Sequence, residues 1–555
     1  MPVAIPPSTK DASASRPFSS ATRAENLEWL TREHFDILII GGGITGCAAA
    51  RDAALRGYRV ALVEKEDFAS GASSRSSRLI HGGLRYLEHR QFGLVHESVV
   101  ERARLLRNAP RLVRPLSFVY PVYRRRYPPY AVLSIGLWLY DLMSIGGRRG
   151  LPRHRMLHAD RLAEVEPLVA ALHVDGAGYY YDAAADDARL TLLTAKAAHH
   201  AGGILVNYAQ AVGLLKAGSK IAGAHVRDVA SGREMEVKAR AVVNAAGPWV
   251  DQVLGLDATP ERPMLRPTKG AHLVVPRARL PIRNAIALRA PRDRRAMFLV
   301  PWGDCAIVGT TDTDYDDQPE NAVADRDDCA YLLEAVRELA PDARLDESDV
   351  ISAYAGVRPL IAAGASHPSS VSREHAIVES KSGLITIAGG KLTTHRAMAE
   401  QLVDRLQNKL LRDSGITPRL ACPTADAPLE AWGDVALLDV PGESAAHLLD
   451  AYGAGAVEVA RIARSKQGWA DPIAPGLPYL RAEAIYAAEH EMAVTLRDFL
   501  MRRTPILYET QDGALLQAGA LAADMGAILG WNDERMEREV AEYEKQFALA
   551  RSFRR

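Results

Sequence analysis

Three glycines and one carboxylate are spaced as a dinucleotide site requires. Gly41, Gly43 and Gly46 form the pattern G-x-G-x-x-G, and Glu64 follows about twenty residues on. In this pattern the first glycine permits a tight turn, the second lets the backbone approach a diphosphate, and the third lets a helix pack closely on a strand. Glu64 can accept hydrogen bonds from ribose hydroxyls, which also disfavours a 2′-phosphorylated cofactor. The pattern predicts a dinucleotide site without separating FAD from NAD.

The elements that must position these residues lie on either side of them. Residues 35–40 form a short apolar run, as expected for a strand buried on both faces of a parallel sheet. Residues 48–56 indicate a helix and residues 59–63 the next strand, which completes a βαβ unit. Two later strand-like segments also lead into glycine turns, at Gly247 and at Gly389-Gly390. Because a flavin needs more than one crossover to hold both of its ends, the three turns together favour FAD.

Composition excludes several classes of function. The chain has 555 residues, enough for roughly three or four domains. Lys plus Arg and Asp plus Glu number 68 each, so no global charge favours nucleic acid as a partner. No run of about 18 apolar residues occurs, so no transmembrane helix is predicted. A reducing compartment and no metal site are expected, because neither C-x-x-C pairing nor metal-ligand spacing is present among Cys47, Cys305, Cys329 and Cys422.

Composition and the spacing of apolar residues predict three regions in the chain. Residues 1–30 are rich in Ser, Ala and Pro and lack an apolar segment, which predicts a disordered tail rather than a secretory signal. Residues 31–410 carry the dinucleotide pattern, and strand-like alternation such as that at 272–276 predicts a second sheet. Residues 411–555 show helical spacing, which predicts an all-α C-terminal domain. Within it, the pair Arg502-Arg503 is interpreted as two cations at a helix C-terminus.

The segment at residues 70–88, S-G-A-S-S-R-S-S-R-L-I-H-G-G-L-R-Y-L-E, closely resembles FAD-dependent, quinone-linked sn-glycerol-3-phosphate dehydrogenases of the bacterial aerobic type. The resemblance runs from about residue 35 into the helical C-terminal region. It implies an α/β fold of the p-hydroxybenzoate-hydroxylase type, in which a Rossmann-like FAD-binding domain is interleaved with a mixed-sheet substrate-binding domain. The FAD-binding domain is expected at about 31–110, 180–255 and 350–410. Further similarity lies at residues 244–249, 269–272, 309–312, 356–360 and 389–394.

The resemblance also implies a reaction. The enzyme is expected to oxidise sn-glycerol 3-phosphate to dihydroxyacetone phosphate by hydride transfer from C2 to flavin N5, and then to pass electrons to a membrane quinone. Mitochondrial members carry C-terminal calcium-binding hands, whereas this chain has no D-x-D-x-D-G loop there, as is typical of a bacterial member. Such a member is expected at the cytoplasmic face of the inner membrane, bound peripherally, or in the cytoplasm. The sequence leaves a homodimer open.

One segment is a candidate contact with that membrane. A basic and aromatic run at residues 124–130 precedes the apolar residues 131–140. This pattern is compatible with a helix that lies on a membrane surface. A core helix behind a basic loop explains it equally well.

The substrate implied by the resemblance requires a cluster of cations. A phosphate monoester carries close to two negative charges, so two or three cations must surround it as a clamp. Arg85, Arg358 and Arg373 are the candidates, although a single arginine is more often a solvated surface charge. Lys391 is expected either to contact substrate or to cap the flavin edge, and Tyr86 either to bind substrate or to fill the core.

Oxidation at C2 also requires a base. Hydride transfer leaves a hydroxyl proton, which a positioned side chain must accept. His81 and His272 are the candidates for this base, each with a structural histidine as the alternative. Arg358 is expected to take part in catalysis as well as in binding.

The expected contacts to FAD lie at the glycine turns and at a helix that begins near Leu392. The unpaired N–H groups of that helix can stabilise negative charge at flavin N1 and C2=O. Thr393 and Thr394 add hydroxyl donors there or simply cap the helix. Cys47 is interpreted as a packing residue behind the diphosphate. The expected FAD-binding residues are Gly41, Gly43, Ile44, Thr45, Gly46, Glu64, Ser76, Leu79, Gly247, Gly390, Lys391, Leu392 and Thr393.

Three other functions compete with this interpretation. A glycerol-3-phosphate oxidase would share the fold and the substrate but pass electrons to oxygen. Another flavin amine or hydroxy-acid oxidase would share the glycine pattern, yet would not require Arg358 and Arg373. A non-catalytic flavin-binding protein is disfavoured because several chemical motifs are intact at once.

Overall fold

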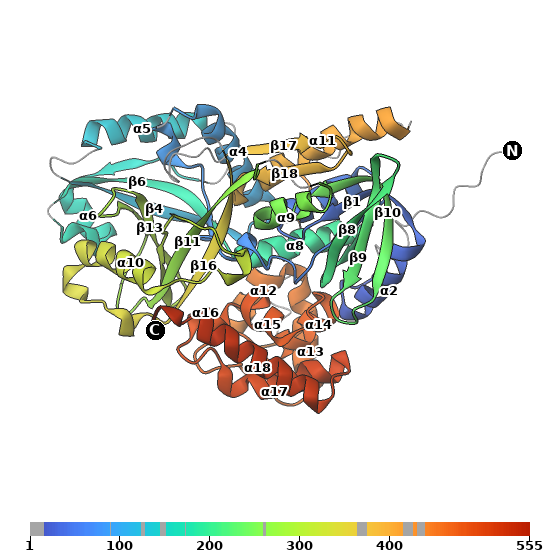
Figure 1. Cartoon of the computed structure of the whole chain (residues 1–555). Coiled ribbons are helices and arrows are strands. Elements are labelled where there is room, and N and C mark those ends of the chain that lie inside the picture. Colours follow the sequence, from blue (N-terminus) through green and yellow to red (C-terminus); the bar gives the residue numbers. More distant parts are fainter. Residues whose placement is uncertain are drawn as a thin grey trace.

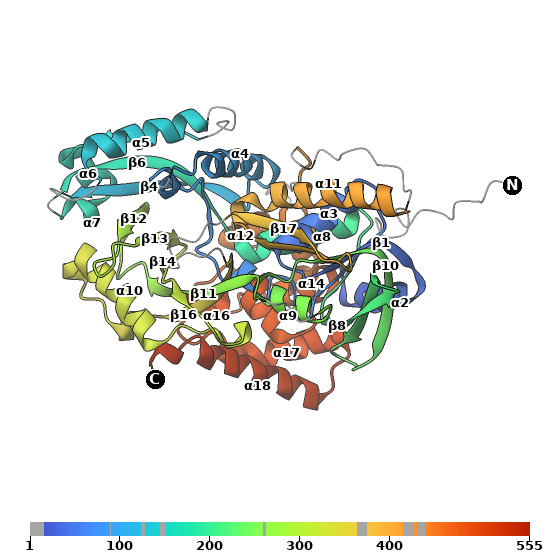
Figure 2. The ribbon, with the colours of Figure 1, turned by 45° about the horizontal axis from the view of Figure 1, so that its top comes forward.

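Two sheets lie side by side, and a group of C-terminal helices packs beneath both (Figure 1). Turning the molecule separates the layers of helices that cover the two sheets (Figure 2). The computed structural model describes residues 16–88, 90–123, 128–144, 151–172, 174–258, 262–362, 374–414, 424, 426–429 and 439–554.

The first sheet is built around the predicted βαβ unit. β1 (His34–Ile40) is buried from Phe35 onward and pairs in parallel with β2 (Val60–Val63) and β10 (Glu234–Asn244). Because strands buried on both faces need apolar side chains throughout, the run at 35–40 suits this central place. The strand order is β17-β18-β10-β1-β2-β7, and a hairpin joins β10 at its side. The other strands are β7 (Ile204–Val206), β8 (Ala209–Ala217), β9 (Lys220–Asp228), β17 (His375–Glu379) and β18 (Ile385–Gly389).

Helices cover one face of this sheet. α3 (Ile44–Leu55) follows the glycine turn after β1 and packs between α8 (Asp187–His200) and α11 (His395–Ser414). Small residues of α3 and large apolar residues of α11 share one core with β1 and β2. This layer fixes the start of α3 against the end of β1, where the glycine pattern lies.

The second sheet is formed by segments that lie between strands of the first. Its order is β15-β11-β14-β13-β12-β4-β6-β3, with β16 on β11 and β5 on β6. β11 (Leu265–Pro276) pairs with β16 (Ser352–Ile361) and sets His272 opposite Tyr354. The approximate boundary at 350 therefore falls just before a strand of the second sheet. The other strands are β3 (Leu79–Ile80), β4 (Val113–Tyr123), β5 (Arg155–Leu157), β6 (Val174–Ala185), β12 (Ala285–Arg289), β13 (Ala296–Trp302), β14 (Cys305–Gly309) and β15 (Thr313–Asp314).

The interleaving of the two sheets confirms the predicted fold class. The predicted strand at 272–276 lies in β11, and α10 (Arg326–Leu339) covers the core of the second sheet. An all-α region follows, also as predicted. Its helices are α12 (Gly442–Tyr452), α13 (Ala456–Ser465), α14 (Ala482–His490), α15 (Leu496–Asp498), α16 (Ile506–Glu509), α17 (Leu515–Leu529) and α18 (Asp533–Leu549).

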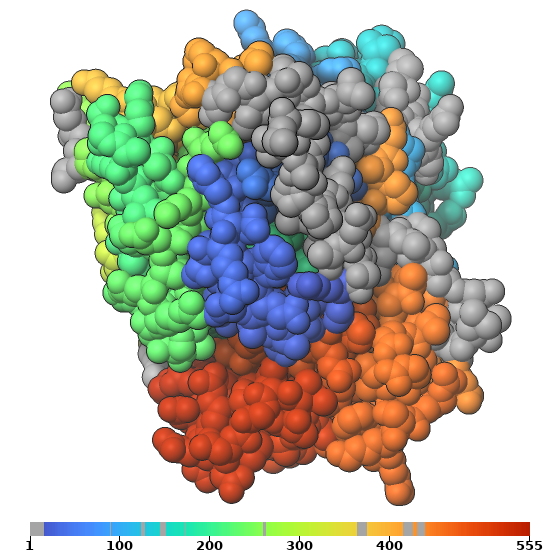
Figure 3. Space-filling view, turned by 90° about the vertical axis from the view of Figure 1, so that its right-hand side faces the viewer, coloured from blue at the N-terminus to red at the C-terminus, as the bar shows by residue number. Residues whose placement is uncertain are grey.

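The C-terminal helices join the two sheets. Phe553, just beyond α18, is fully buried in the core of the second sheet, and the Ser552 hydroxyl donates to the Ala324 carbonyl at 3.1 Å. On the opposite side, the red C-terminal helices adjoin the blue N-terminal segments (Figure 3). The C-terminal domain therefore holds both halves of the fold.

The pair Arg502-Arg503 lies in the last turn of a helix, as interpreted from the sequence, and it is also part of this junction. Both side chains are buried in a π-helical turn (Phe499–Arg503), and both donate to the Asp67 carboxylate, from Arg502 at 2.6 Å. Burial acts to raise the pKa of Asp67, but Arg503 and Arg502 lower it on balance. The pair thus ties the C-terminal domain to the loop that follows β2.

The predicted disordered tail is wrong from Ser20 onward. Residues 20–32 form α2 (Ser20–Arg32), whose first turn is capped by the Ser19 hydroxyl. Arg23 pairs with Asp228 at 2.5 Å, and the Asn26 side chain donates to the Leu205 carbonyl at 3.0 Å. These partners are distant in sequence, so composition did not reveal them. Residues 1–15 lie outside the described residues.

The apolar segment at 131–140 forms α5 (Tyr130–Met143) on the outer side of the second sheet (Figure 2). Leu133, Leu137 and Tyr140 are buried against the sheet, whereas the opposite side of the helix is exposed. Residues 124–127 of the preceding basic run lie outside the described residues. Within the part of the chain that the structure describes, no helix is both long and apolar enough to span a membrane. The remaining α-helices are α4 (Phe92–Asn108), α6 (Ala159–Val165), α7 (Pro167–Ala170) and α9 (Val250–Gly255).

Candidate active site

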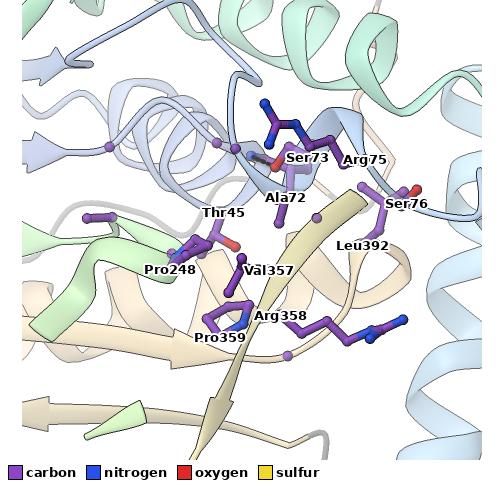
Figure 4. Close-up of a pocket in the computed structure, with 18 of the residues that line it drawn as sticks. Thr45, Ala72, Ser73, Arg75, Ser76, Pro248, Val357, Arg358, Pro359 and Leu392 are labelled. Carbon is purple, nitrogen blue, oxygen red and sulfur yellow. Dashed lines mark hydrogen bonds between the residues drawn. The ribbon is translucent and has the colours of Figure 1, made fainter. Parts of the chain in front are cut away.

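A cavity of about 550 Å³ lies where the two sheets meet. Its wall combines residues from the turn after β1, the loop that follows β2, the turn after β10, and β16. In Figure 4 these four segments are represented by Thr45, Ser73, Pro248 and Val357, which lie around the same space. One cavity therefore collects residues from both sheets.

The glycine pattern forms one end of this wall in the way its spacing predicts. Gly41 has φ of 117°, and a Cβ there would lie 2.5 Å from the Ala245 carbonyl oxygen. A Cβ on Gly46 would overlap the carbonyl oxygen of Gly41, so α3 can pack this closely only through glycine. Gly43 borders the cavity at the start of α3, where the Ile44 N–H donates to the Ser73 hydroxyl at 3.0 Å. Glycine thus keeps a cradle open that side chains would fill.

Glu64 lies at the same end and is held by backbone donors. Its carboxylate accepts from the Gly42 N–H at 2.6 Å and from the Glu66 N–H at 2.9 Å. Burial raises the pKa of Glu64, and these two N–H groups oppose that rise. The carboxylate also borders the cavity, as a ribose ligand must.

The other residues expected to bind FAD fall into two groups. Twelve of the expected thirteen border the cavity, whereas Gly46 contributes through packing behind it. Cys47 is fully buried, its thiol donates to the Gly42 carbonyl at 3.4 Å, and burial raises its pKa. The twelve that border the cavity are Gly41, Gly43, Ile44, Thr45, Glu64, Ser76, Leu79, Gly247, Gly390, Lys391, Leu392 and Thr393.

The helix expected near Leu392 begins there as a short 3₁₀ turn (Leu392–Thr394) that continues into α11. Thr393 uses its hydroxyl to hold the neighbouring strand end, because it accepts from the His81 N–H at 3.1 Å. The Thr394 hydroxyl instead donates to the Lys391 carbonyl at 3.5 Å, within its own turn. The helix start and His81 are therefore fixed to each other.

Two of the expected cations share one aromatic ring. The Lys391 ammonium lies 3.9 Å from the centroid of the Tyr86 ring, and the Arg85 guanidinium lies 4.8 Å from it. Arg85 also donates to the Tyr86 hydroxyl at 3.2 Å. All three residues border the cavity. Arg373, the third arginine of the predicted clamp, lies outside the described residues.

Arg358 lies in β16, where several acceptors hold its guanidinium. Its guanidinium donates to Asp312 Oδ1 at 3.1 Å, to the Thr310 hydroxyl at 2.9 Å, and to the Thr311 carbonyl at 3.1 Å. It also lies directly on Gly270, where a Cβ would come within 2.5 Å of Nη1. These contacts fix the orientation of the cation at the cavity wall.

His272 is enclosed on both faces. Its ring stacks on Tyr354 with the centroids 4.8 Å apart, and a Cβ on Gly309 would come within 2.9 Å of Cγ. His272 Nε2 lies 2.8 Å from the Ser77 hydroxyl. Burial, together with the charges of Arg358 and Arg78, lowers the pKa of His272 to about 3. The ring is therefore neutral at physiological pH and available as a hydrogen-bond acceptor or donor.

Sequence reasoning missed several residues of the cavity wall. Arg295 donates to the Asp312 carbonyl at 2.7 Å and lies 3.9 Å from its carboxylate, so it adds another cation beside Arg358. It was overlooked because residues 292–295 form a charged run that suggests a solvated surface. Ser77 and Asp312 lay within recognised motifs, but their roles depend on strand neighbours that the sequence does not show.

Comparisons with known proteins point in one direction. Residues 36–405 match the family model described as FAD dependent oxidoreductase, and residues 383–536 match the C-terminal domain of alpha-glycerophosphate oxidase. A "Glycerol-3-phosphate dehydrogenase 2" of Mycobacterium bovis is 38% identical over 531 residues, covering 94% of this chain and 90% of that protein. An "Aerobic glycerol-3-phosphate dehydrogenase" of Staphylococcus saprophyticus is 36% identical over 548 residues, covering 96% and 97%.

A solved structure is similar over nearly the whole length. The glycerol-3-phosphate dehydrogenase from Bacillus halodurans, complexed with FAD, superposes with a TM-score of 0.79 at 31% identity, covering 97% of this chain and 99% of that chain. The L-alpha-glycerophosphate oxidase from Mycoplasma pneumoniae, with FAD bound, shares the fold at a TM-score of 0.53 and 18% identity. It covers 68% of this chain and 95% of that chain.

Proposed function

Because this chain belongs to the family of FAD-dependent glycerol-3-phosphate dehydrogenases, we propose that it oxidises sn-glycerol 3-phosphate to dihydroxyacetone phosphate and delivers the electrons to a membrane quinone. The observation that carries the proposal is the meeting of two kinds of residue in one cavity. A glycine cradle with Glu64 lies at one end, and several cations with two histidines lie along the wall. A dinucleotide and a small phosphorylated alcohol need this combination.

The cofactor end of the cavity suits FAD. Gly41, Gly43 and the start of α3 would hold the diphosphate, and Glu64 the adenosine ribose. The turn at Gly390 and the helix start at Leu392 would support the ring system. Bound FAD supplies the acceptor for the hydride that leaves C2.

The cations support a phosphate site on the opposite wall. Arg358 and Arg295 lie on either side of the Asp312 side chain, while Arg85 and Lys391 lie on Tyr86. Four cations exceed the charge of the nearby Asp312 carboxylate, so the wall favours a doubly charged anion. Arginine binds phosphate oxygens through paired N–H donors, which orients the ligand as well as binding it. Held in this way, the substrate presents its C2 group in a fixed direction.

The two histidines supply alternative proton acceptors. His81 borders the cavity and is fixed by Thr393, while His272 is neutral and lies within hydrogen-bond reach of Ser77. The hydroxyl proton of the substrate would pass to one of these rings as the C2–H bond breaks. Burial makes a protonated His272 costly, so His272 would have to pass such a proton on at once.

The proposed reaction is tested by anaerobic reduction of the bound flavin. Addition of sn-glycerol 3-phosphate to the yellow holoenzyme should bleach the absorbance at about 450 nm that is typical of oxidised flavins. Glycerol and sn-glycerol 1-phosphate serve as controls for the phosphate and for the stereochemistry. A fully loaded enzyme that stays yellow with sn-glycerol 3-phosphate would contradict the substrate assignment.

A quinone acceptor requires access to a membrane surface, and α5 offers a suitable one. Four of its apolar side chains share one side of the helix at spacings of three or four residues. They are exposed by 43% at Val132, 67% at Ile135, 61% at Trp138 and 45% at Leu142. An amphipathic helix with such a face can lie in the interface of a bilayer. The exposed Trp138 fits this proposal, because indole rings favour the interface between lipid and water.

Membrane binding and acceptor choice can be measured separately. Co-sedimentation with vesicles of anionic phospholipid should be lost in the double variant Ile135→Ser with Trp138→Ser, and retained in the control Leu516→Ser, which removes an apolar side chain that is 87% exposed on α17. Equal sedimentation of both variants would argue against α5 as the contact.

Reoxidation of the reduced enzyme should be much faster with a soluble quinone than with oxygen, and the reverse order would indicate an oxidase.

A further inference from the structure

A loop of the second sheet reaches across to the cofactor end of the first. Residues 315–321 form the first part of the connection between β15 and α10 and contain a 3₁₀ turn (Pro319–Asn321). The loop is stiffened from within, because the Tyr315 hydroxyl donates to the Gln318 carbonyl at 3.1 Å and the Asn321 side chain donates to Asp317 at 3.1 Å. Its tip is therefore a defined surface rather than a loose connection.

The tip is fastened to residues that border the cofactor end of the cavity. Glu320 Oε1 accepts from the Trp249 indole N–H at 2.7 Å and also pairs with the Lys65 ammonium. Lys65 lies 4.1 Å from the centroid of the Trp249 ring. A second bond is made beside it, from the Gln252 side chain to Gln318 Oε1 at 2.8 Å.

The three anchoring residues of the first sheet surround the place where an adenosine would lie. Lys65 follows Glu64 directly, and Lys65, Trp249 and Gln252 all border the cavity. The Trp249 ring also covers Gly71 in the loop that follows β2, where a Cβ would lie 2.8 Å from the ring. The ring is thus held between that loop on one side and Glu320 on the other.

We propose that residues 315–321 form a strap that closes the adenosine end of the FAD site and slows the release of the cofactor. The part of the chain that forms the second sheet then contributes to retention of FAD as well as to the cavity wall proposed to bind substrate. The inference depends on the FAD site alone and holds whichever substrate the enzyme oxidises.

One bond of the strap, the ion pair between Lys65 and Glu320, should be weakened by salt. Lys65 and Glu320 are partly exposed, so mobile ions screen their attraction. The bonds from Trp249 and Gln252 are less sensitive to ions. Release of FAD should therefore accelerate with ionic strength, but only while Glu320 is present.

The test measures release of FAD from the holoenzyme, which is followed by the rise in flavin fluorescence after dilution. Glu320→Ala should raise the rate constant of release roughly tenfold at low salt, because it removes the acceptor shared by Lys65 and Trp249. Between about 0.05 and 1 M salt, the wild-type rate should rise towards that of the variant, whose own rate should stay nearly constant. Glu334→Ala is the matched control, since it breaks an exposed pair with Arg292 outside the cavity wall.

A second variant separates the strap from a general loss of stability. Trp249→Phe removes the donor to Glu320 and also the indole atoms Cζ3 and Cη2 that lie over Gly71, so only part of its effect on the release rate comes from the lost bond. The same change should add less in the Glu320→Ala background than in the wild type, because the shared bond is already lost there. Equal release rates in wild type, Glu320→Ala and Glu334→Ala would overturn the proposal. Additive effects of the two changes would overturn it as well.

Discussion

The structure permits a test of Arg358 that leaves every charge in the cavity unchanged. Gly270 lies beneath the guanidinium, and a Cβ at this position would come within 2.5 Å of Nη1 and closer still to Nη2. Ordinary contact begins at 3.4 Å, so the guanidinium would have to retreat by roughly 1 Å. Gly270→Ala therefore moves a cation without removing it.

The size of the effect follows from the bonds that Arg358 would lose. A hydrogen bond to a charged group contributes about 1.5–3 kcal/mol, so losing one such bond to the phosphate lowers kcat/KM by about 10- to 100-fold. The cost to folding should be about 1–3 kcal/mol, because the displaced guanidinium also shifts its bonds to Asp312 and Thr310. Gly270 borders the cavity beneath Arg358 and belongs to none of the three glycine turns expected to hold FAD, so flavin content should stay at the wild-type level.

The assay is the rate of anaerobic flavin reduction against sn-glycerol 3-phosphate concentration, with the flavin content determined beforehand. Gly519→Ala is the matched control, because a Cβ there meets no atom within 4 Å. If the effect passes through Arg358, Gly270→Ala should cause little further loss in an Arg358→Ala background. A wild-type kcat/KM in Gly270→Ala, or full additivity with Arg358→Ala, would remove Arg358 from the substrate site.

Three further predictions concern folding and the cavity wall. Gly46→Ala should lower the free energy of unfolding by about 3 kcal/mol or more, because its Cβ would overlap the Gly41 carbonyl, and flavin content should fall with it. An unchanged melting temperature would refute the packing role of Gly46. Arg295→Ala should lower kcat/KM about tenfold at full flavin content, measured by the same reduction assay. Burial lowers the pKa of His272 to about 3 and those of His199 and His395 to about 4, whereas the unfolded chain binds these protons near pH 6.5. The free energy of unfolding, measured in urea, should therefore fall by about 1.4 kcal/mol per histidine for each pH unit between about 6 and 4.5, and the slope should be smaller by that amount in His199→Asn.

The sequence was most informative at positions where the backbone conformation or a close contact permits only one residue type. Gly41 needs a positive φ and Gly46 a missing Cβ, and both requirements are local, so spacing predicted the βαβ unit well. Arg295 and Ser77 could not be predicted in the same way, because their partners come from other strands. The tail prediction failed at α2 for a related reason, since its first turn is fixed by Asp228, far along the chain.

The Arg502-Arg503 pair shows how this difference bears on function. The sequence predicted two cations at a helix C-terminus and gave no sign of a buried partner. In the fold, Asp67 is buried and accepts from both, and it lies only a few residues before the cavity loop that carries Ser73 and Ser76. A buried carboxylate requires such partners: the C-terminal domain supplies these two cations, and the Asn207 side chain donates to the same carboxylate at 3.1 Å. The C-terminal helices therefore help to hold the loop that borders the cavity, although among the described residues none of these helices borders the cavity itself.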